Sequence, residues 1–201
     1  MAEVLITLGI IGVVAALTMP SLVQNFEKSI TEAKLKNFYS KINQAIRLSE
    51  IDNGPVADWN LSEPDIFYNQ YLDKYIKTVG QETYYNFENV KFYVVIFPDG
   101  TAMGLRKHYG YDVIFFISAK NIKDGHDVNG RNVFAFNLRN TLSSGMKTFF
   151  EPYTYSWDGT EEYLMNNNVY GCNENNLNRA YCTKLIQLNS WKIPKDYPLK
   201  F

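Results

Sequence analysis

Residues 2–20 read AEVLITLGIIGVVAALTMP, an almost wholly apolar run that carries a carboxylate, Glu3, near its start. From Val4 to Met19 the run has no charged side chain. A carboxylate at the centre of a bilayer costs roughly 2.5–3.5 kcal/mol on insertion scales, and less near the interface. We therefore expect Glu3 to have a partner that compensates for this cost.

The length of the run suits a short transmembrane helix, which needs about 20 apolar residues. A secretory signal peptide is disfavoured, because the residues before the run are acidic and the first Lys or Arg is Lys28. The positive charges that follow the run favour a cytoplasmic location for the rest of the chain. A disulfide, considered below, favours the opposite side. The location expected from the charges and the location expected from the disulfide agree if basic residues precede Met1, because those residues would then hold the N-terminal side in the cytoplasm.

The apolar pattern continues as one stripe at helical spacing, which predicts that a single helix extends well beyond the run. The helix should end at residues 52–55, DNGP, where Gly54 can take the C-terminal cap position and Pro55 cannot continue the helix. About 50 residues of helix would be roughly 75 Å long. We expect a kink at Pro20, between the apolar and the amphipathic parts. The stripe consists of Phe26, Ile30, Ala33, Phe38, Ile42, Ala45 and Ser49.

The remainder of the chain has the composition of a soluble domain. The whole chain has 201 residues, of which 20% are charged and 15% are aromatic, and its net charge is −1. The pI of about 6.1 provides no long-range attraction for nucleic acid. The many Tyr and Phe residues could form a stacking surface for a ligand, but without a basic patch they indicate a core and subunit contacts.

Alternating and apolar runs predict an antiparallel meander over residues 91–97, 101–107 and 111–118, with a fourth strand at 133–138. A helix is predicted from a cap at Ser62 to Gly80. Because residues 91–97 are apolar on both faces, one face should pack on the long helix and the other on a covering element or a neighbour. The predicted fold class is α+β: a long helix on an antiparallel sheet, with an irregular, disulfide-bonded C-terminal region.

Cys172 and Cys182 are the two cysteines, and they flank a polar, Asn-rich loop. Without further Cys or nearby His residues they make a poor zinc site. A disulfide between them would stabilise the fold by about 2–3 kcal/mol in the chain-entropy model and would place the domain in an oxidising compartment. Two unrelated reduced thiols are the alternative.

The start of the chain resembles the N-terminal region of type IV pilins and type II secretion pseudopilins. The shared features are the carboxylate, the apolar helix with small residues and the proline near the membrane exit, within AEVLITLGIIGVVAALTMPSL (residues 2–22). The resemblance implies that Glu3 meets the N-terminal amine of a neighbouring subunit inside a filament. It also implies a single pass through the bacterial inner membrane, with residues 1–25 as the transmembrane and assembly helix. Residues 26–201 would be a globular domain outside the cytoplasm, in a periplasmic or surface filament.

The partners implied by the resemblance are homologous pilin or pseudopilin subunits, the inner membrane and, before maturation, a prepilin peptidase that prepares the N-terminus for methylation. The sequence departs from the family pattern because the basic leader, the Gly at the cleavage site and the Phe after it are absent. Met1 stands where many family members have Leu. We expect the reading frame to continue upstream into a basic stretch that ends in Gly-Phe.

Asp124, Asp127 and Asn129 are spaced as oxygen ligands, with glycines between and after them, and loosely resemble a calcium loop. The distal Glu of an EF-hand is missing, although some pseudopilins bind calcium in a C-terminal loop. A turn rich in Asp and Asn is the simpler interpretation. We therefore assign no metal or other cofactor, with calcium as the alternative.

His108 and His126 are the two histidines, and neither belongs to a metal-binding or hydrolase motif. We expect no enzyme activity. The leading hypothesis is a structural filament subunit, and the alternative is a periplasmic binding module that uses the first helix only as a membrane tether. Glu3 discriminates between them, because a simple tether has no use for a carboxylate.

Overall fold

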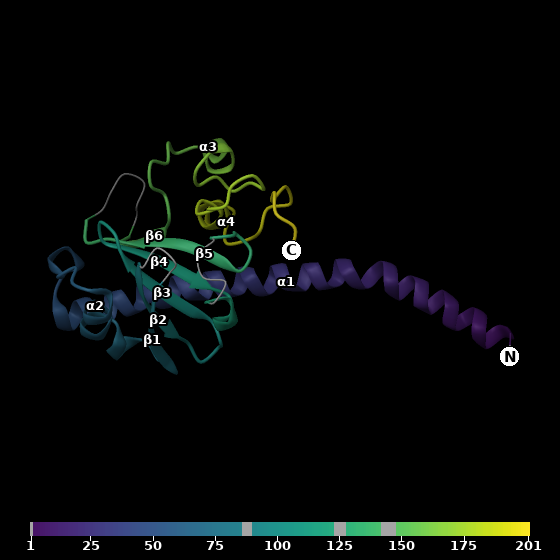
Figure 1. Ribbon diagram of the computed structural model, residues 1–201, viewed down its shortest axis with the longest axis horizontal. Helices are drawn as coiled ribbons and strands as arrows, with labels where there is room; N and C mark the ends of the chain where they lie inside the picture. Colours follow the sequence, from purple (N-terminus) through teal and green to yellow (C-terminus); the bar gives the residue numbers. More distant parts are fainter. Residues whose placement is uncertain (1, 86–89, 123–127, 142–147) are drawn as a thin grey trace.

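The computed structural model describes residues 2–85, 90–122, 128–141 and 148–201, except for the side chains of residues 2, 3, 5 and 6. Figure 1 shows a long helix, α1, that lies along a sheet and projects far beyond it at the N-terminal end. The predicted α+β class, with a long N-terminal helix on an antiparallel sheet, is confirmed.

Helix α1 spans Ala2–Asn53. It ends where the sequence predicts: Gly54 has a φ of +76°, and its N–H donates to the Glu50 carbonyl. Glycine adopts this left-handed conformation without a Cβ clash, which is why the helix stops there.

The six strands form one antiparallel meander in the order β1-β2-β3-β4-β5-β6. The four predicted strands are confirmed as β2 to β5, with ends that differ by at most two residues. The bounds are β1 Gly80–Tyr85, β2 Lys91–Ile96, β3 Ala102–Lys107, β4 Tyr111–Phe116, β5 Val133–Leu138 and β6 Phe150–Pro152.

One face of the sheet packs against α1. The Phe38 ring stacks on Phe115 of β4 with 4.1 Å between ring centroids. Its edge meets Phe136 of β5 at 5.2 Å and Phe150 of β6 at 5.7 Å. Because alternate residues of a strand point to the same face, these rings form one layer beneath the helix.

The opposite face of β2 is also covered, as its doubly apolar sequence predicts. Phe92 and Val94 belong to a second buried cluster, which includes Phe116 of β4 and Ile122. Ile122 ends the short 3-10 helix η3, Ala119–Ile122. The covering element of this cluster is therefore η3, supplied by the same chain.

The helix predicted from Ser62 to Gly80 is wrong in its second half. Helix α2 spans Pro64–Tyr71 and is followed by the 3-10 helix η2, Asp73–Tyr75. Glu63 rather than Ser62 occupies the N-cap position. Gly80 begins β1 by pairing with Ile96 of β2, and the Val79 N–H already donates to the Ile96 carbonyl at 2.8 Å, so the end of the predicted helix is bonded to the sheet instead.

The C-terminal region is more regular than the sequence predicts. It contains β6 and two short helices, α3 (Glu161–Asn166) and α4 (Cys182–Leu188). Thr160 caps α3 by accepting a hydrogen bond from the Tyr163 N–H at 3.1 Å. A further 3-10 helix, η1 (Val56–Asp58), connects α1 to α2.

Candidate functional site

The N-terminal part of α1 presents apolar side chains to its surroundings on every side. From Val4 to Phe26 the described large apolar side chains are 53 to 76% exposed. We call residues 4–26 the apolar half of α1. Helix α1 is long and apolar enough to cross a membrane, and its most apolar window makes no buried contact with the domain. These side chains are Val4, Leu8, Ile10, Ile11, Val13, Val14, Leu17, Met19, Leu22, Val23 and Phe26.

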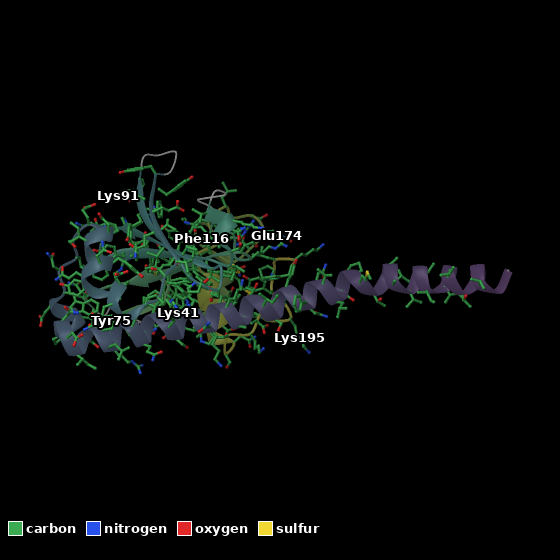
Figure 2. All side chains as sticks on the ribbon, turned by 90° about the horizontal axis from the view of Figure 1, so that it is seen from below. Lys41, Tyr75, Lys91, Phe116, Glu174 and Lys195 are labelled. Carbon is green, nitrogen blue, oxygen red and sulfur yellow. A yellow bond between two sulfur atoms is a disulfide. The ribbon has the colours of Figure 1, made fainter. Side chains whose placement is uncertain are left out.

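The second part of α1, residues 27–53, is fastened to the domain, and we call it the anchored half. Its buried positions begin at Thr31 and recur along one face as far as Ser49. Polar contacts add to this packing: the Lys34 ammonium donates to the Ile117 carbonyl at 2.9 Å. Glu32 accepts hydrogen bonds from the Ile193 N–H at 2.9 Å and from Lys192 at 2.7 Å. Figure 2 shows the side chains of the domain packed around this half, whereas the other half carries only the side chains of the helix itself.

Glu3 lies in the helical backbone of α1, but its side chain is outside the described residues. Its pairing with a neighbouring amine therefore stays a prediction. Pro20 lies inside α1 and does not end it. Figure 1 shows the projecting part of α1 bending away from the line of the rest, and a kink at Pro20 itself stays a prediction.

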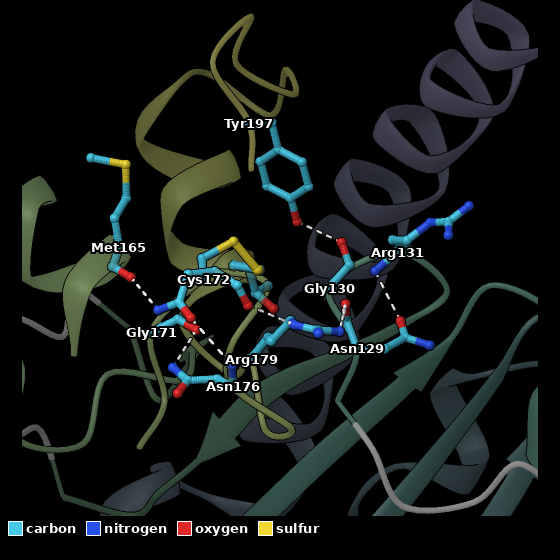
Figure 3. The surroundings of a disulfide bond; sticks show 12 residues. Asn129, Gly130, Arg131, Met165, Gly171, Cys172, Asn176, Arg179 and Tyr197 are labelled. Atoms are coloured by element: carbon cyan, nitrogen blue, oxygen red, sulfur yellow. Dashed lines mark hydrogen bonds between the residues drawn. A yellow bond between two sulfur atoms is a disulfide. The ribbon is translucent and has the colours of Figure 1, made fainter. Parts of the chain in front are cut away.

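Cys172 and Cys182 form the predicted disulfide, and their Cα atoms lie 4.7 Å apart. Both residues are fully buried. Figure 3 shows side chains of the loop between them turned back onto its own backbone. Asn176 donates to the Gly171 carbonyl at 2.9 Å, and Arg179 donates through Nε to the Asn173 carbonyl at 2.8 Å. Asn176 and Arg179 of this polar loop thus serve as internal hydrogen-bond donors.

The calcium hypothesis concerns residues of which only Asn129 is described, because Asp124 and Asp127 lie outside the described residues, as does His126. The Asn129 Oδ1 accepts hydrogen bonds from three backbone N–H groups, those of residues 131, 132 and 133, at 2.9 to 3.2 Å. This oxygen is occupied by the turn, as the simpler interpretation predicts. Among the described residues, no three His, Cys, Asp or Glu side chains gather as a metal site would require.

Comparison with known proteins places the chain in a family. Residues 21–201 match the family described as "Family of unknown function (DUF6613)". The chain belongs to this family. No curated protein and no solved structure matches the chain. The DUF6613 match begins directly after Pro20, so it covers the end of the apolar half, the anchored half and the whole domain.

This DUF6613 domain also holds a cleft that sequence analysis missed. It lies on the face of the sheet opposite α1, beneath the C-terminal region, and has a volume of about 280 Å³. Charged groups come from neighbouring strands, because Arg106 of β3 pairs directly with Asp112 of β4. The sequence signal that could have indicated this ion pair is the presence of opposite charges at facing positions of the predicted hairpin. The residues that line it include Arg106, His108, Asp112, Tyr153 and Tyr170.

Asp112 is the electrostatic centre of the cleft, with a side chain only 4% exposed. Arg106 and Arg139 both form ion pairs with its carboxylate, the latter at 3.4 Å, and His108 Nδ1 lies 3.6 Å away. Burial, reinforced by the neighbouring Tyr170, raises the pKa of Tyr153 well above its usual range, so its hydroxyl stays neutral. The described lining contains no Ser, Thr or Cys beside His108. The cleft therefore combines a buried, ion-paired carboxylate with the aromatic side chains of Tyr153 and Tyr170.

Proposed function

We propose that the chain is a structural subunit of a filament of the type IV pilus or type II secretion pseudopilus kind. The observation that carries the proposal is the apolar half of α1, which projects bare from a domain that holds the rest of the helix. The apolar half is about 34 Å long at 1.5 Å per residue, close to the roughly 30 Å hydrocarbon core of a bilayer. In the membrane these side chains would face lipid, and in a filament they would face the helices of other subunits.

Small residues in the apolar half support close packing between helices. Apart from the neighbouring backbone of α1 itself, no described atom lies within 4 Å of where a Cβ would stand on Gly9 or Gly12. Small residues let the backbones of neighbouring helices approach one another in an apolar environment. Homologous subunits are thus the partners we propose, with the inner membrane as the location before assembly and a prepilin peptidase as the processing enzyme.

The disulfide supports the proposed location of the domain. A buried bridge between Cys172 and Cys182 is typical of proteins in an oxidising compartment. We therefore place the domain outside the cytoplasm, in a periplasmic or surface filament. The function we propose involves no catalysis and no cofactor.

Glu3 provides the sharpest test of filament assembly. If its carboxylate pairs with a neighbour's amine in an apolar interior, removing it leaves a buried charge unpaired at a cost of roughly 3–5 kcal/mol. We expect Glu3→Ala and Glu3→Gln to leave the subunit folded and membrane-inserted, and to reduce its incorporation into filaments sharply. The measurement compares sheared filaments with membrane fractions, with each variant expressed from the native locus in place of the wild-type gene.

Glu27→Ala is the matched control, because Glu27 is an exposed carboxylate just beyond the apolar half. It should assemble as the wild type does. Normal assembly of both Glu3 variants would contradict an intersubunit role for Glu3. Loss of all three variants from the membrane fraction would point to a defect in insertion instead.

A membrane-tethered binding module is the second candidate, and the cleft around Asp112 is the observation that favours it. In that case insertion of α1 would suffice for function, and both Glu3 variants would behave as the wild type does. The two candidates thus differ in the outcome of the same experiment.

A further inference from the structure

The apolar half of α1 leads into the domain without a linker. Phe26 is its last exposed apolar side chain, and Thr31 is already buried. The helix rises only about 7 Å between these residues. The headgroup layer on each side of a bilayer is roughly 5–7 Å thick. If the apolar half spans the membrane, as the proposed function requires, the adjoining end of the domain lies at the level of the headgroups.

Several segments meet at this end of the domain. Phe201, Arg131 and Asn132 line a shallow depression together with Glu27 and Ile30 of α1. The Arg131 guanidinium lies 5.8 Å from the centroid of the Phe201 ring. Figure 1 shows the C-terminus next to α1, where the helix leaves the domain.

Basic side chains are exposed at the same end. Lys192, Lys195 and Lys200 belong to the C-terminal segment that bonds to α1 through Glu32, and Figure 2 shows Lys195 at the end of the domain from which the projecting half emerges. We use the name basic collar for the four exposed side chains of Arg131, Lys192, Lys195 and Lys200.

Acidic side chains neutralise only part of the collar. Glu32 pairs with Lys192 at 2.7 Å. Glu27 and Asp196 are the other described side-chain carboxylates here, whereas half-buried Lys28 of α1 adds a cation. Cations therefore exceed carboxylates among the described side chains of this end, although the whole chain has a net charge of −1.

We propose that the basic collar binds the anionic phospholipid headgroups of the leaflet from which α1 emerges. Each Lys or Arg close to an anionic membrane surface strengthens binding roughly fivefold. The attraction acts over about 8 Å at physiological ionic strength, so a collar at the level of the headgroups would lie within its range. The contact would hold the domain against the membrane before assembly, and it would break when the subunit leaves the bilayer for a filament.

The test uses the full chain in two kinds of lipid nanodisc, one of phosphatidylcholine and one with phosphatidylglycerol added. Backbone hydrogen exchange is measured over residues 191–201 by mass spectrometry. We expect exchange to be roughly fivefold slower or more in the anionic discs, and the difference to vanish at high salt. The triple variant R131Q/K195Q/K200Q should also abolish the difference in exchange between the two lipids. Lys192 is left in place because it pairs with Glu32.

The matched control is R47Q/K77Q/K107Q, which removes three cations away from the collar and should keep the protection. Equal exchange in the two lipids, with the protein in the disc, overturns the lipid contact and leaves membrane insertion standing. Failure to enter either disc overturns insertion and this inference together. Protection that survives the collar substitutions overturns the role of these residues. Protection that appears only with several copies per disc assigns this end of the domain to a second subunit instead.

Discussion

At the scale of single residues, Gly130 shows how the absence of a side chain brings distant segments together. Its φ is +71°, and a Cβ there would lie 2.5 Å from the Cys182 sulfur and 2.8 Å from Leu199 Cδ1. Its carbonyl accepts a hydrogen bond from the Tyr197 hydroxyl at 2.5 Å. Figure 3 shows this turn against the disulfide. Gly130, which belongs to the suggested calcium loop, is thus the residue whose missing side chain leaves room for the disulfide.

Gly130→Ala should destabilise the domain by about 2–5 kcal/mol, since left-handed strain and a steric clash add together. Gly100→Ala is the control, because Gly100 has a φ of +76° and nothing within 4 Å of its Cβ position. That variant should lose only about 1–2 kcal/mol, from the backbone conformation alone. Denaturant unfolding of both variants gives the comparison, and equal losses would contradict the close contact with the disulfide.

At the scale of elements, the disulfide joins the start of α4 to the segment that follows α3. Cys182 is the first residue of α4, and Cys172 lies ten positions earlier. The Ala135 N–H of β5 donates to the Thr183 hydroxyl at 3.2 Å, so α4 is also bonded to the sheet. The bridge therefore stabilises the placement of the C-terminal region on a sheet that has its own core.

Replacing both cysteines by alanine should cost about 2–3 kcal/mol, a fall in Tm of roughly 5–10 °C, while the sheet and α1 stay folded. Circular dichroism and thermal unfolding measure the change. Both cysteines are buried, so the bond itself is checked by alkylation in denaturant without reductant. Two alkylated thiols in the exported protein would contradict the disulfide.

At the scale of the whole molecule, the chain consists of a domain with its own core and an apolar half of α1 that contributes nothing to that core. The anchored half packs on the sheet through Phe38 and holds Glu32 and Lys34 in polar contacts. The stability of the domain therefore depends on the anchored half, whereas the proposed assembly depends on the apolar half.

A chain that begins at Phe26 should accordingly be folded, soluble and monomeric without detergent, because the amphipathic face of the anchored half stays covered. Light scattering after size exclusion measures its mass, and circular dichroism its fold. The full chain, as the control, should require detergent or lipid. A truncated chain that is well folded yet aggregates would contradict the coverage of this face.

Local patterns along the chain were enough to predict α1 and its end at Gly54, and the strands β2 to β5. In the turn between β2 and β3 the Asp99 carboxylate accepts a hydrogen bond from the Thr101 N–H at 3.0 Å. Such features depend on helical or strand periodicity and on residues only a few positions apart. The pairing of Cys172 with Cys182 was also predictable, since the chain contains no other cysteine.

The tertiary structure alone decided the features that depend on contacts between distant segments. Strand β1 begins at Gly80, where the predicted helix was expected to end, and it forms by pairing with the edge of β2. Strand β6 has only three residues, including Pro152. The cleft around Asp112 and the place of Gly130 against the disulfide require the C-terminal region to fold over the sheet. Pairing and packing of this kind are set by which surfaces meet, and periodicity along the chain does not encode them.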